Sequence, residues 1–162
     1  GQRVGAGTVA QGVAAGAFDR ALEFVQNREQ FGRPIAEFQG LQWMLVDMSI
    51  KLDAARNMLW QAAASGGVSG FPDAMLAAKS KIIASEAAID VTNNALQMFG
   101  AAGYSRNQPM ERAVRDARMF TIAGGTAQIL RTLVASKLLD RKLPQTRNGY
   151  VSADLRAAMA AE

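Results

Sequence analysis

The chain has 162 residues, of which 49% are hydrophobic and 20% are charged, a composition typical of one soluble globular domain with a sizeable core. It contains no cysteine and no histidine. This excludes disulfides, thiol nucleophiles, Ser–His or Cys–His catalysis and histidine-ligated metal, and we predict no metal site. Acid–base chemistry would fall to Asp, Glu, Lys or Tyr, or to a bound cofactor.

The net charge is +4, and the Lys and Arg residues are spread along the chain. They indicate either a solvated surface or an anion site for phosphate or CoA-like groups. Nucleic acid is disfavoured, because there is no basic run and no basic stripe interleaved with aromatic residues. No apolar run reaches the ~18 residues of a membrane span, and the first residues do not resemble a signal peptide. Together with the absence of cysteine, these features predict a cytoplasmic protein.

The first predicted helix covers residues 4–29 and includes several interior glycines. Each of them costs about 0.5–1 kcal/mol relative to alanine, so they indicate that a neighbouring helix or a ligand packs very close. Gly32 and Pro34 end this helix. The apolar residues recur at roughly helical spacing: Val4, Val9, Val13, Ala17, Leu22 and Val25.

A second helix is predicted from about Glu37 to Ala64, with a well-defined apolar stripe. Residues 65–72 form a loop that is rich in glycine and closed by Pro72. Asp73 is placed to favour the start of a third helix, which runs to about Phe99. The stripe of the second helix consists of Leu41, Leu45, Met48, Leu52, Ala55 and Leu59.

A short fourth helix is predicted over residues 109–119, with Glu111 and Arg115 as a favourable i,i+4 pair. Thr126 begins a fifth helix. No strand alternation and no repeat is found, so we predict an all-α fold: an up-and-down four-helix bundle with a short extra helix over residues 1–140. Residues 141–162 are a tail, either a docked helix or frayed. The inward residues of the fifth helix are predicted to be Ile129, Leu130, Leu133, Val134 and Leu138.

Three segments combine polar side chains, glycines and aromatic residues at the ends of predicted helices, where sites usually lie. They cover residues 28–32, 97–104 and 115–128. Glycines let a backbone approach a ligand, and exposed N–H groups at the start of a helix favour phosphate. Each segment alone is a weak signal, because a glycine loop after a helix is usually a C-cap.

Taken in chain order, these segments resemble the C-terminal helical domain of the acyl-CoA dehydrogenases. The resemblance covers residues 3–140 and rests on NREQFGRPIAEFQGLQWMLVDM and on ALQMFGAAGYSRNQPMERAVRDARMFTIAGGTAQILR. The family's corresponding patterns are R-x-x-F-G-x-x-I-x-x-F-Q-x-x-Q, Q-x-x-G-G-x-G-Y, P-x-E-R-x-x-R-D-A-R and E-G-T-x-x-I-x-R. The order and spacing of several motifs make this resemblance highly specific.

The resemblance implies a three-domain protein in which FAD lies between a central β domain and this bundle and is also held by a neighbouring subunit. It implies that Arg3 and Gly125 lie at the acyl-CoA site. Ala101 stands where the family usually has glycine. The residues implied to contact FAD are Arg28, Gln30, Phe31, Gln97, Phe99, Gly100, Ala101, Thr126 and Gln128.

The sequence departs from the family at the catalytic base. In the family, a carboxylate removes the α-proton of the acyl thioester while a β-hydride passes to FAD, and this base commonly belongs to E-G-T. Here the motif is Gly124–Gly125–Thr126, and glycine cannot accept a proton. The alternative position on the first helix carries Gln2, which also cannot act as a base. No catalytic residue is therefore assigned.

Three hypotheses remain open at this point. In the first, the chain is the bundle of an FAD-dependent acyl-CoA dehydrogenase whose catalytic base comes from elsewhere or from a partner subunit. A related possibility is that the enzyme carries out chemistry other than dehydrogenation on an acyl-CoA. Alternatively it is a non-catalytic flavin- or CoA-binding or scaffolding relative, or a plain helical interaction domain. We expect acyl-CoA, the missing domains or a partner subunit, and a homo- or hetero-oligomer as its partners. Arg115, Asp116 and Arg118 are expected to form a structural ion-pair network.

Overall fold

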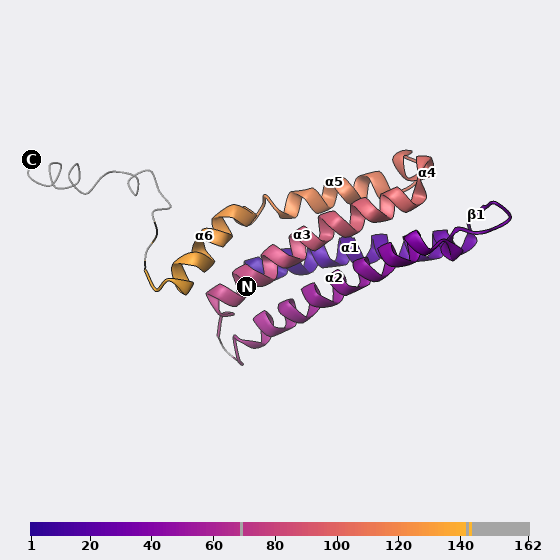
Figure 1. Ribbon diagram of the computed structural model, residues 1–162. Helices are drawn as coiled ribbons and strands as arrows, with labels where there is room; N and C mark the ends of the chain where they lie inside the picture. Colours follow the sequence, from indigo (N-terminus) through magenta and orange to yellow (C-terminus); the bar gives the residue numbers. More distant parts are fainter. Residues whose placement is uncertain (69, 142, 144–162) are drawn as a thin grey trace, which may run out of the picture.

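The structure is a computed structural model that describes residues 1–68, 70–141 and 143. Three helices of 26 residues form its body: α1 (Gln2–Asn27), α2 (Gln39–Ala64) and α3 (Ala74–Phe99). Two shorter helices follow one another in the fourth position, α5 (Met110–Phe120) and α6 (Ala127–Leu138), as Figure 1 shows. The predicted all-α, up-and-down four-helix bundle is confirmed.

The connection between α1 and α2 is a small protruding hairpin. Strands β1 (Glu29–Gln30) and β2 (Arg33–Pro34) pair antiparallel, and a 3-10 turn, η1 (Ile35–Glu37), leads into α2. Phe31 and Gly32 form the tip, both with positive φ, at 56° and 76°. The sequence predicted a break here but no strand, because strands of two residues are too short to show an alternating pattern.

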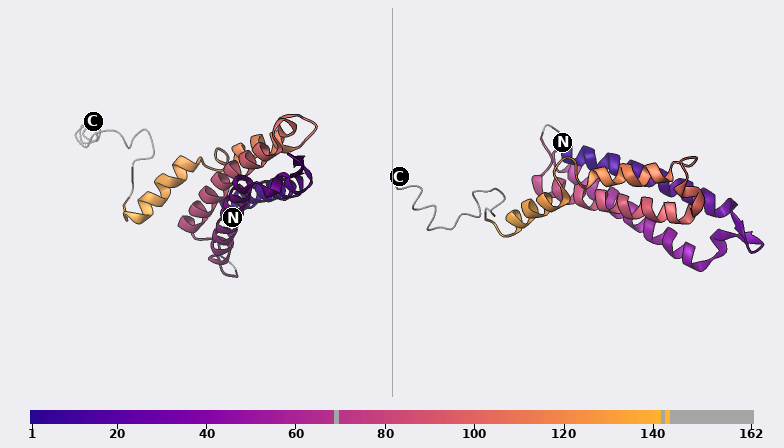
Figure 2. Two further views of the ribbon diagram at one scale, coloured as in Figure 1. Left: turned by 45° about the vertical axis from the view of Figure 1, so that its right-hand side comes forward. Right: turned by 90° about the horizontal axis from the view of Figure 1, so that it is seen from above.

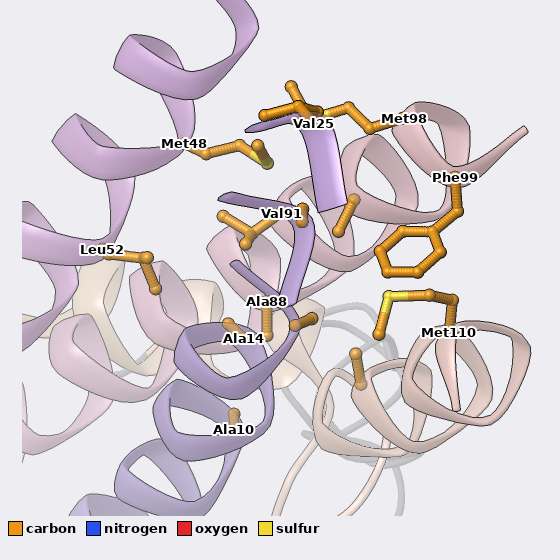
Figure 3. Packing of buried hydrophobic residues seen from close by; sticks show 14 of the residues in the cluster. Ala10, Ala14, Val25, Met48, Leu52, Ala88, Val91, Met98, Phe99 and Met110 are labelled. Atoms are coloured by element: carbon orange, nitrogen blue, oxygen red, sulfur yellow. The ribbon is translucent and has the colours of Figure 1, made fainter. Parts of the chain in front are cut away.

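Small residues, rather than the largest ones, form the core between α1 and its neighbours. Ala10, Ala14, Ala17, Ala21 and Val25 of α1 are buried, as Figure 3 shows in part. Val9 and Leu22 belong to the apolar set at helical spacing, yet their side chains are 55% and 39% exposed. A row of alanines lets helices pack closely, so the interface follows the small residues instead of the bulky ones.

The interior glycines of α1 do not all mark close packing. A Cβ added at Gly7 would lie 2.8 Å from Leu59 Cδ2 and 3.4 Å from Lys81 Cα, so here α1 approaches both α2 and α3. An added Cβ at Gly5, Gly12 or Gly16 would meet nothing within 4 Å. The predicted close approach of a neighbouring helix is therefore found at Gly7.

Among the long helices, α6 packs chiefly on α3, and it extends beyond the body of the bundle, as Figure 2 also shows. Of its predicted inward residues, Leu130 is fully buried. Ile129 and Leu138 are 48% and 67% exposed, and the prediction that they face inward is wrong. One supporting helix covers only a narrow stripe of α6, which is too small for five inward residues.

Helix α2 buries Met48, Leu52, Ala55 and Leu59, as its apolar stripe predicted, while Leu41 and Leu45 are half-buried. On its other face it exposes several large apolar side chains: Trp43, Val46, Ile50 and Trp60. None of the helices in the described ranges is long and apolar enough to cross a membrane. The predicted tail 141–162 lies almost wholly outside the described residues.

Candidate functional site

The predicted site residues fall into two groups, and the first lies at the hairpin end of the bundle. Here the end of α1, the hairpin and the end of α3 surround a hollow of about 360 Å³. The rings of Phe24 and Phe99 stack at 4.1 Å between centroids and form its apolar floor. The hollow is lined by Phe24, Arg28, Gln30, Ile35, Met98, Phe99, Gly100, Ala101 and Ala102.

This hollow suits a flat group that carries negative charge. The stacked rings offer an apolar surface, and the Arg28 guanidinium takes part in no ion pair of the described residues. Gly100 has φ 57°, which turns the chain sharply from α3 into the one-turn helix α4 (Ala101–Tyr104). The sequence did not predict α4, because Gly100 and Gly103 together indicate a loop.

Two other residues expected near the cofactor lie beside this hollow without lining it. Phe31, at the hairpin tip, is 91% exposed, and its ring meets Phe38 edge to face at 6.2 Å between centroids. The exposed Gln97 lies two residues before the end of α3. Both could reach a ligand that extends beyond this chain, and they contribute no wall of the hollow itself.

The second group surrounds the turn between α5 and α6. Gly124 and Gly125 have φ values of 70° and 94°, in the left-handed region that favours glycine. A Cβ added at Gly124 would lie 3.9 Å from the Ala6 Cβ. Gln2 and Arg3 precede Ala6 by four and three residues on α1, so they share its face. Gln2 and Gly124, the two positions at which the resemblance led us to expect a carboxylate, thus lie at the same end of the bundle.

The start of α6 completes this second group. The Thr126 hydroxyl accepts a hydrogen bond from the Ile129 N–H at 3.2 Å and caps the helix. Gln128 is exposed on the first turn. The turn is therefore held in a defined conformation, while the Gln128 side chain stays open to a ligand.

Lys81 also belongs to this group, although the sequence analysis did not single it out. Its side chain is fully buried, and its ammonium donates a hydrogen bond to the Gly125 carbonyl at 2.8 Å. Burial in these surroundings lowers the pKa of Lys81, because desolvation penalises the charged form. A sequence signal for this burial does exist, because Lys81 stands in the middle of a helix face of small residues. They are Ala77, Ala78, Ala84 and Ser85.

The two groups lie far apart on one chain. Figure 1 shows the hairpin and α4 at the end of the bundle opposite the chain's N-terminus. Eighteen residues of α1 separate Ala6 from Phe24, which corresponds to about 27 Å at ~1.5 Å per residue. Residues of both groups therefore cannot surround the same part of one ligand.

The expected ion-pair network of α5 is not found among the described residues. Arg115 pairs with Glu111 at 3.0 Å, as the i,i+4 spacing predicted, and the pair is exposed. Asp116 and Arg118 take part in none of the ion pairs formed within the described ranges. An exposed pair of this kind contributes roughly 0.3–0.5 kcal/mol, so it does not fix the neighbouring turn.

Comparison with known proteins gives the class to which this fold and site belong. Residues 1–139 match the family model described as "Acyl-CoA dehydrogenase, C-terminal domain". The chain therefore belongs to the acyl-CoA dehydrogenase family and corresponds to its C-terminal domain. The resemblance stated from the sequence motifs is confirmed.

Among curated relatives, the chain is 66% identical over 152 residues to the 3-sulfinopropanoyl-CoA desulfinase of Advenella mimigardefordensis, covering 94% of this chain and 37% of that protein. It thus spans little more than a third of the length of such relatives.

Among solved structures, butyryl-CoA dehydrogenase from Megasphaera elsdenii matches with a TM-score of 0.81 and 37% identity over 85% of this chain and 36% of that one. An FAD complex of PigA matches with a TM-score of 0.76 and 29% identity over 82% and 34%.

Proposed function

We propose that this chain is the C-terminal domain of an acyl-CoA desulfinase that releases sulfite from 3-sulfinopropanoyl-CoA. The observation that carries the proposal is the glycine at position 124, in a chain that is 66% identical to a protein of that name. This replaces α,β-dehydrogenation, the activity first expected from the family. Loss of the base is compatible with desulfination, because the bond to be broken lies at the β-carbon.

The proposed reaction consumes water and needs no external oxidant. The bond between the β-carbon and sulfur breaks, the carbon gains a proton, and the sulfur gains a hydroxyl group. The products are propanoyl-CoA and sulfite. Atoms and charge balance without a net transfer of electrons to an acceptor. An active site for this reaction has no use for a carboxylate that removes an α-proton, and Gly124 removes that competing chemistry.

FAD is the cofactor that we propose for the complete protein, and the residues of the hairpin end fit it. The apolar floor of Phe24 and Phe99 suits a flat ring, and Arg28 suits a pyrophosphate. Gln30, Gly100 and Ala101 line the same hollow, with Phe31 and Gln97 beside it. In family chemistry, FAD when bound supplies a hydride acceptor, whereas the reaction proposed here has no net redox change.

We propose that Thr126 and Gln128 also face FAD, with Arg3 and Gly125 beside the acyl thioester. Because the two groups of residues lie about 27 Å apart along α1, they would serve two cofactors, each shared between subunits. This separation supports the expected oligomer, in which the site is completed by missing domains or by a partner subunit.

The function is tested by assaying the full-length, flavin-loaded protein with 3-sulfinopropanoyl-CoA and, separately, with butanoyl-CoA and an electron-accepting dye. We expect sulfite release from the first and no dye reduction with the second. Dye reduction by the unaltered protein would favour a dehydrogenase whose base comes from elsewhere. Neither activity would favour a non-catalytic, flavin-binding relative.

The missing base is tested by Gly124→Glu, with Gly124→Gln as a matched control of equal size and equal backbone strain. If the site is otherwise intact, Gly124→Glu should raise dye-linked dehydrogenation above the background of the unaltered protein, and Gly124→Gln should not. Equal activity of both variants in flavin-loaded samples would contradict the assigned position of the base.

A further inference from the structure

Lys81 is a buried cation whose surroundings converge from three directions. Gly7 of α1 and Leu59 of α2 pack at its position on α3, and its ammonium reaches the Gly125 carbonyl at 2.8 Å. A small apolar cluster lies between this part of α3 and the facing residues of α2: Ala55, Leu59, Ala84 and Ala87, with Val4 and Ile83 at its edge. The Lys81 side chain itself is fully buried.

The positive charge of Lys81 is not neutralised within the described part of the chain. Its hydrogen-bond partner is a carbonyl, which is neutral, and none of the ion pairs found there includes Lys81. Glu86, further along α3, is already paired with Arg131 of α6 at 2.7 Å. The charge therefore acts on whatever occupies the space beside the Gly124–Gly125 turn.

Gly124 makes this charge more effective. A glycine adds no negative side chain to the turn, and a carboxylate at the same position would lie close enough to offset the ammonium. A charge behind a low-dielectric wall is screened less by solvent and salt than an exposed one. The turn thus presents a positive potential together with an open, glycine-lined surface.

We propose that Lys81 is a positioning residue that fixes the Gly124–Gly125 turn and makes it selective for acyl thioesters with an anionic end. A sulfinate carries such a charge, as does a carboxylate of the same chain length, whereas a saturated acyl chain does not. The Lys81 side chain donates its hydrogen bond to the Gly125 carbonyl at 2.8 Å, which ties α3 to the turn. The inference rests on the proposed function for the identity of the natural anionic substrate.

The test measures dissociation constants for succinyl-CoA and butanoyl-CoA, which differ at the chain end by a carboxylate in place of a methyl group. Full-length, flavin-loaded protein is used, unaltered and as Lys81→Met, Lys81→Arg and Lys79→Met. The unaltered protein should prefer succinyl-CoA, and Lys81→Met should lower that preference about tenfold. Lys81→Arg keeps the positive charge and should retain most of the preference for succinyl-CoA. Lys79→Met removes a half-buried lysine of the same helix and should change nothing.

Equal weakening of both ligands by Lys81→Met would overturn the proposal, because it would show a scaffolding role without charge selectivity. If Lys81→Met fails to fold, the same test is made with Gly124→Glu and Gly124→Gln. These variants leave Lys81 in place, and only the first adds a negative charge to the turn. The glutamate should lower the preference for succinyl-CoA and the glutamine should not; an equal effect of both would overturn the inference.

The two proposals fail in distinguishable ways. A protein that prefers succinyl-CoA through Lys81 but releases no sulfite would contradict the desulfinase function alone. A protein that releases sulfite, but whose preference for succinyl-CoA is unchanged by Lys81→Met, would contradict the charge inference alone.

Discussion

At the scale of single residues, Lys81 should make the stability of the fold depend on pH. Its pKa is lowered from 10.5 by burial, so between the lowered value and 10.5 the unfolded chain binds more protons than the folded one. Stability contributed by this residue therefore rises with pH through that window and is lost as pH falls. We expect the stability of the unaltered chain relative to Lys81→Met to rise as the pH increases toward 10.5, measured by urea unfolding over the alkaline range.

The comparison with Lys81→Met isolates this residue, because the other titrating groups are common to both proteins. Lys79→Met serves as control, and its difference from the unaltered chain should stay constant over the same range. A difference for Lys81→Met that stays flat or reverses with pH would contradict the burial of a charged ammonium.

A motif assigns a role to a single residue, which stays a prediction here, whereas helical periodicity does not show which side chains the packing buries. Gly124 could be identified from the motif alone, since the neighbouring Gly125 and Thr126 set the register. Val9 could not be placed correctly, because helical periodicity gives most weight to bulky residues and the interface follows alanines instead. Lys81 was missed for a related reason: lysine is normally exposed, and only the surrounding small residues indicate otherwise.

At the scale of elements, the start of α3 depends on one side chain. Asp73 accepts hydrogen bonds from the N–H groups of Met75 and Leu76 at 2.9 and 2.8 Å. Asp73→Ala should lower the free energy of unfolding by about 1 kcal/mol, and Asp73→Asn should restore most of the loss. Urea unfolding of the chain measures both.

Asp47→Ala provides the control for this cap, because Asp47 is exposed in the middle of α2. It should change the free energy of unfolding by less than about 0.5 kcal/mol. A similar loss at Asp47 and Asp73 would show that the cap has no special role.

The long helices could be predicted from sequence because their breaks are chemically marked. Asp73 indicated the start of α3, and Gly32 with Pro34 indicated the end of α1. The hairpin and α4 could not be predicted, since each is too short for its periodic pattern to repeat. Their conformations depend on Phe31, Gly32 and Gly100, whose backbones take positive φ values.

At the scale of the whole molecule, this chain presents one side of a binding site. The hollow at the hairpin end is open, and Phe31 is 91% exposed. We expect the purified chain to hold FAD weakly, because none of its described residues covers the opposite side of the hollow. Its absorption spectrum after gel filtration with added FAD should show far less than one flavin per chain. A stoichiometric yellow complex would contradict this expectation.

The sequence placed every candidate residue at the end of an element but could not show how the residues group together. Arg28 and Gly124 belong to two patterns of the same family, and they lie at opposite ends of the bundle. A motif records order along the chain, whereas the distance between its parts depends on the length and direction of α1. The grouping therefore became visible only in three dimensions.

The one-sided support of α6 has a consequence for local unfolding. Helices packed on a single neighbour open with less free energy than the rest of a domain. In native-state hydrogen exchange, amides of α6 should therefore exchange well before those of α1 and α3. Removing the Glu86–Arg131 pair with Arg131→Met should increase the difference in exchange rate between α6 and the other two helices. Binding of an acyl thioester beside Gly125 should narrow it, so that exchange protection at the start of α6 would report occupancy of the site without any measurement of turnover.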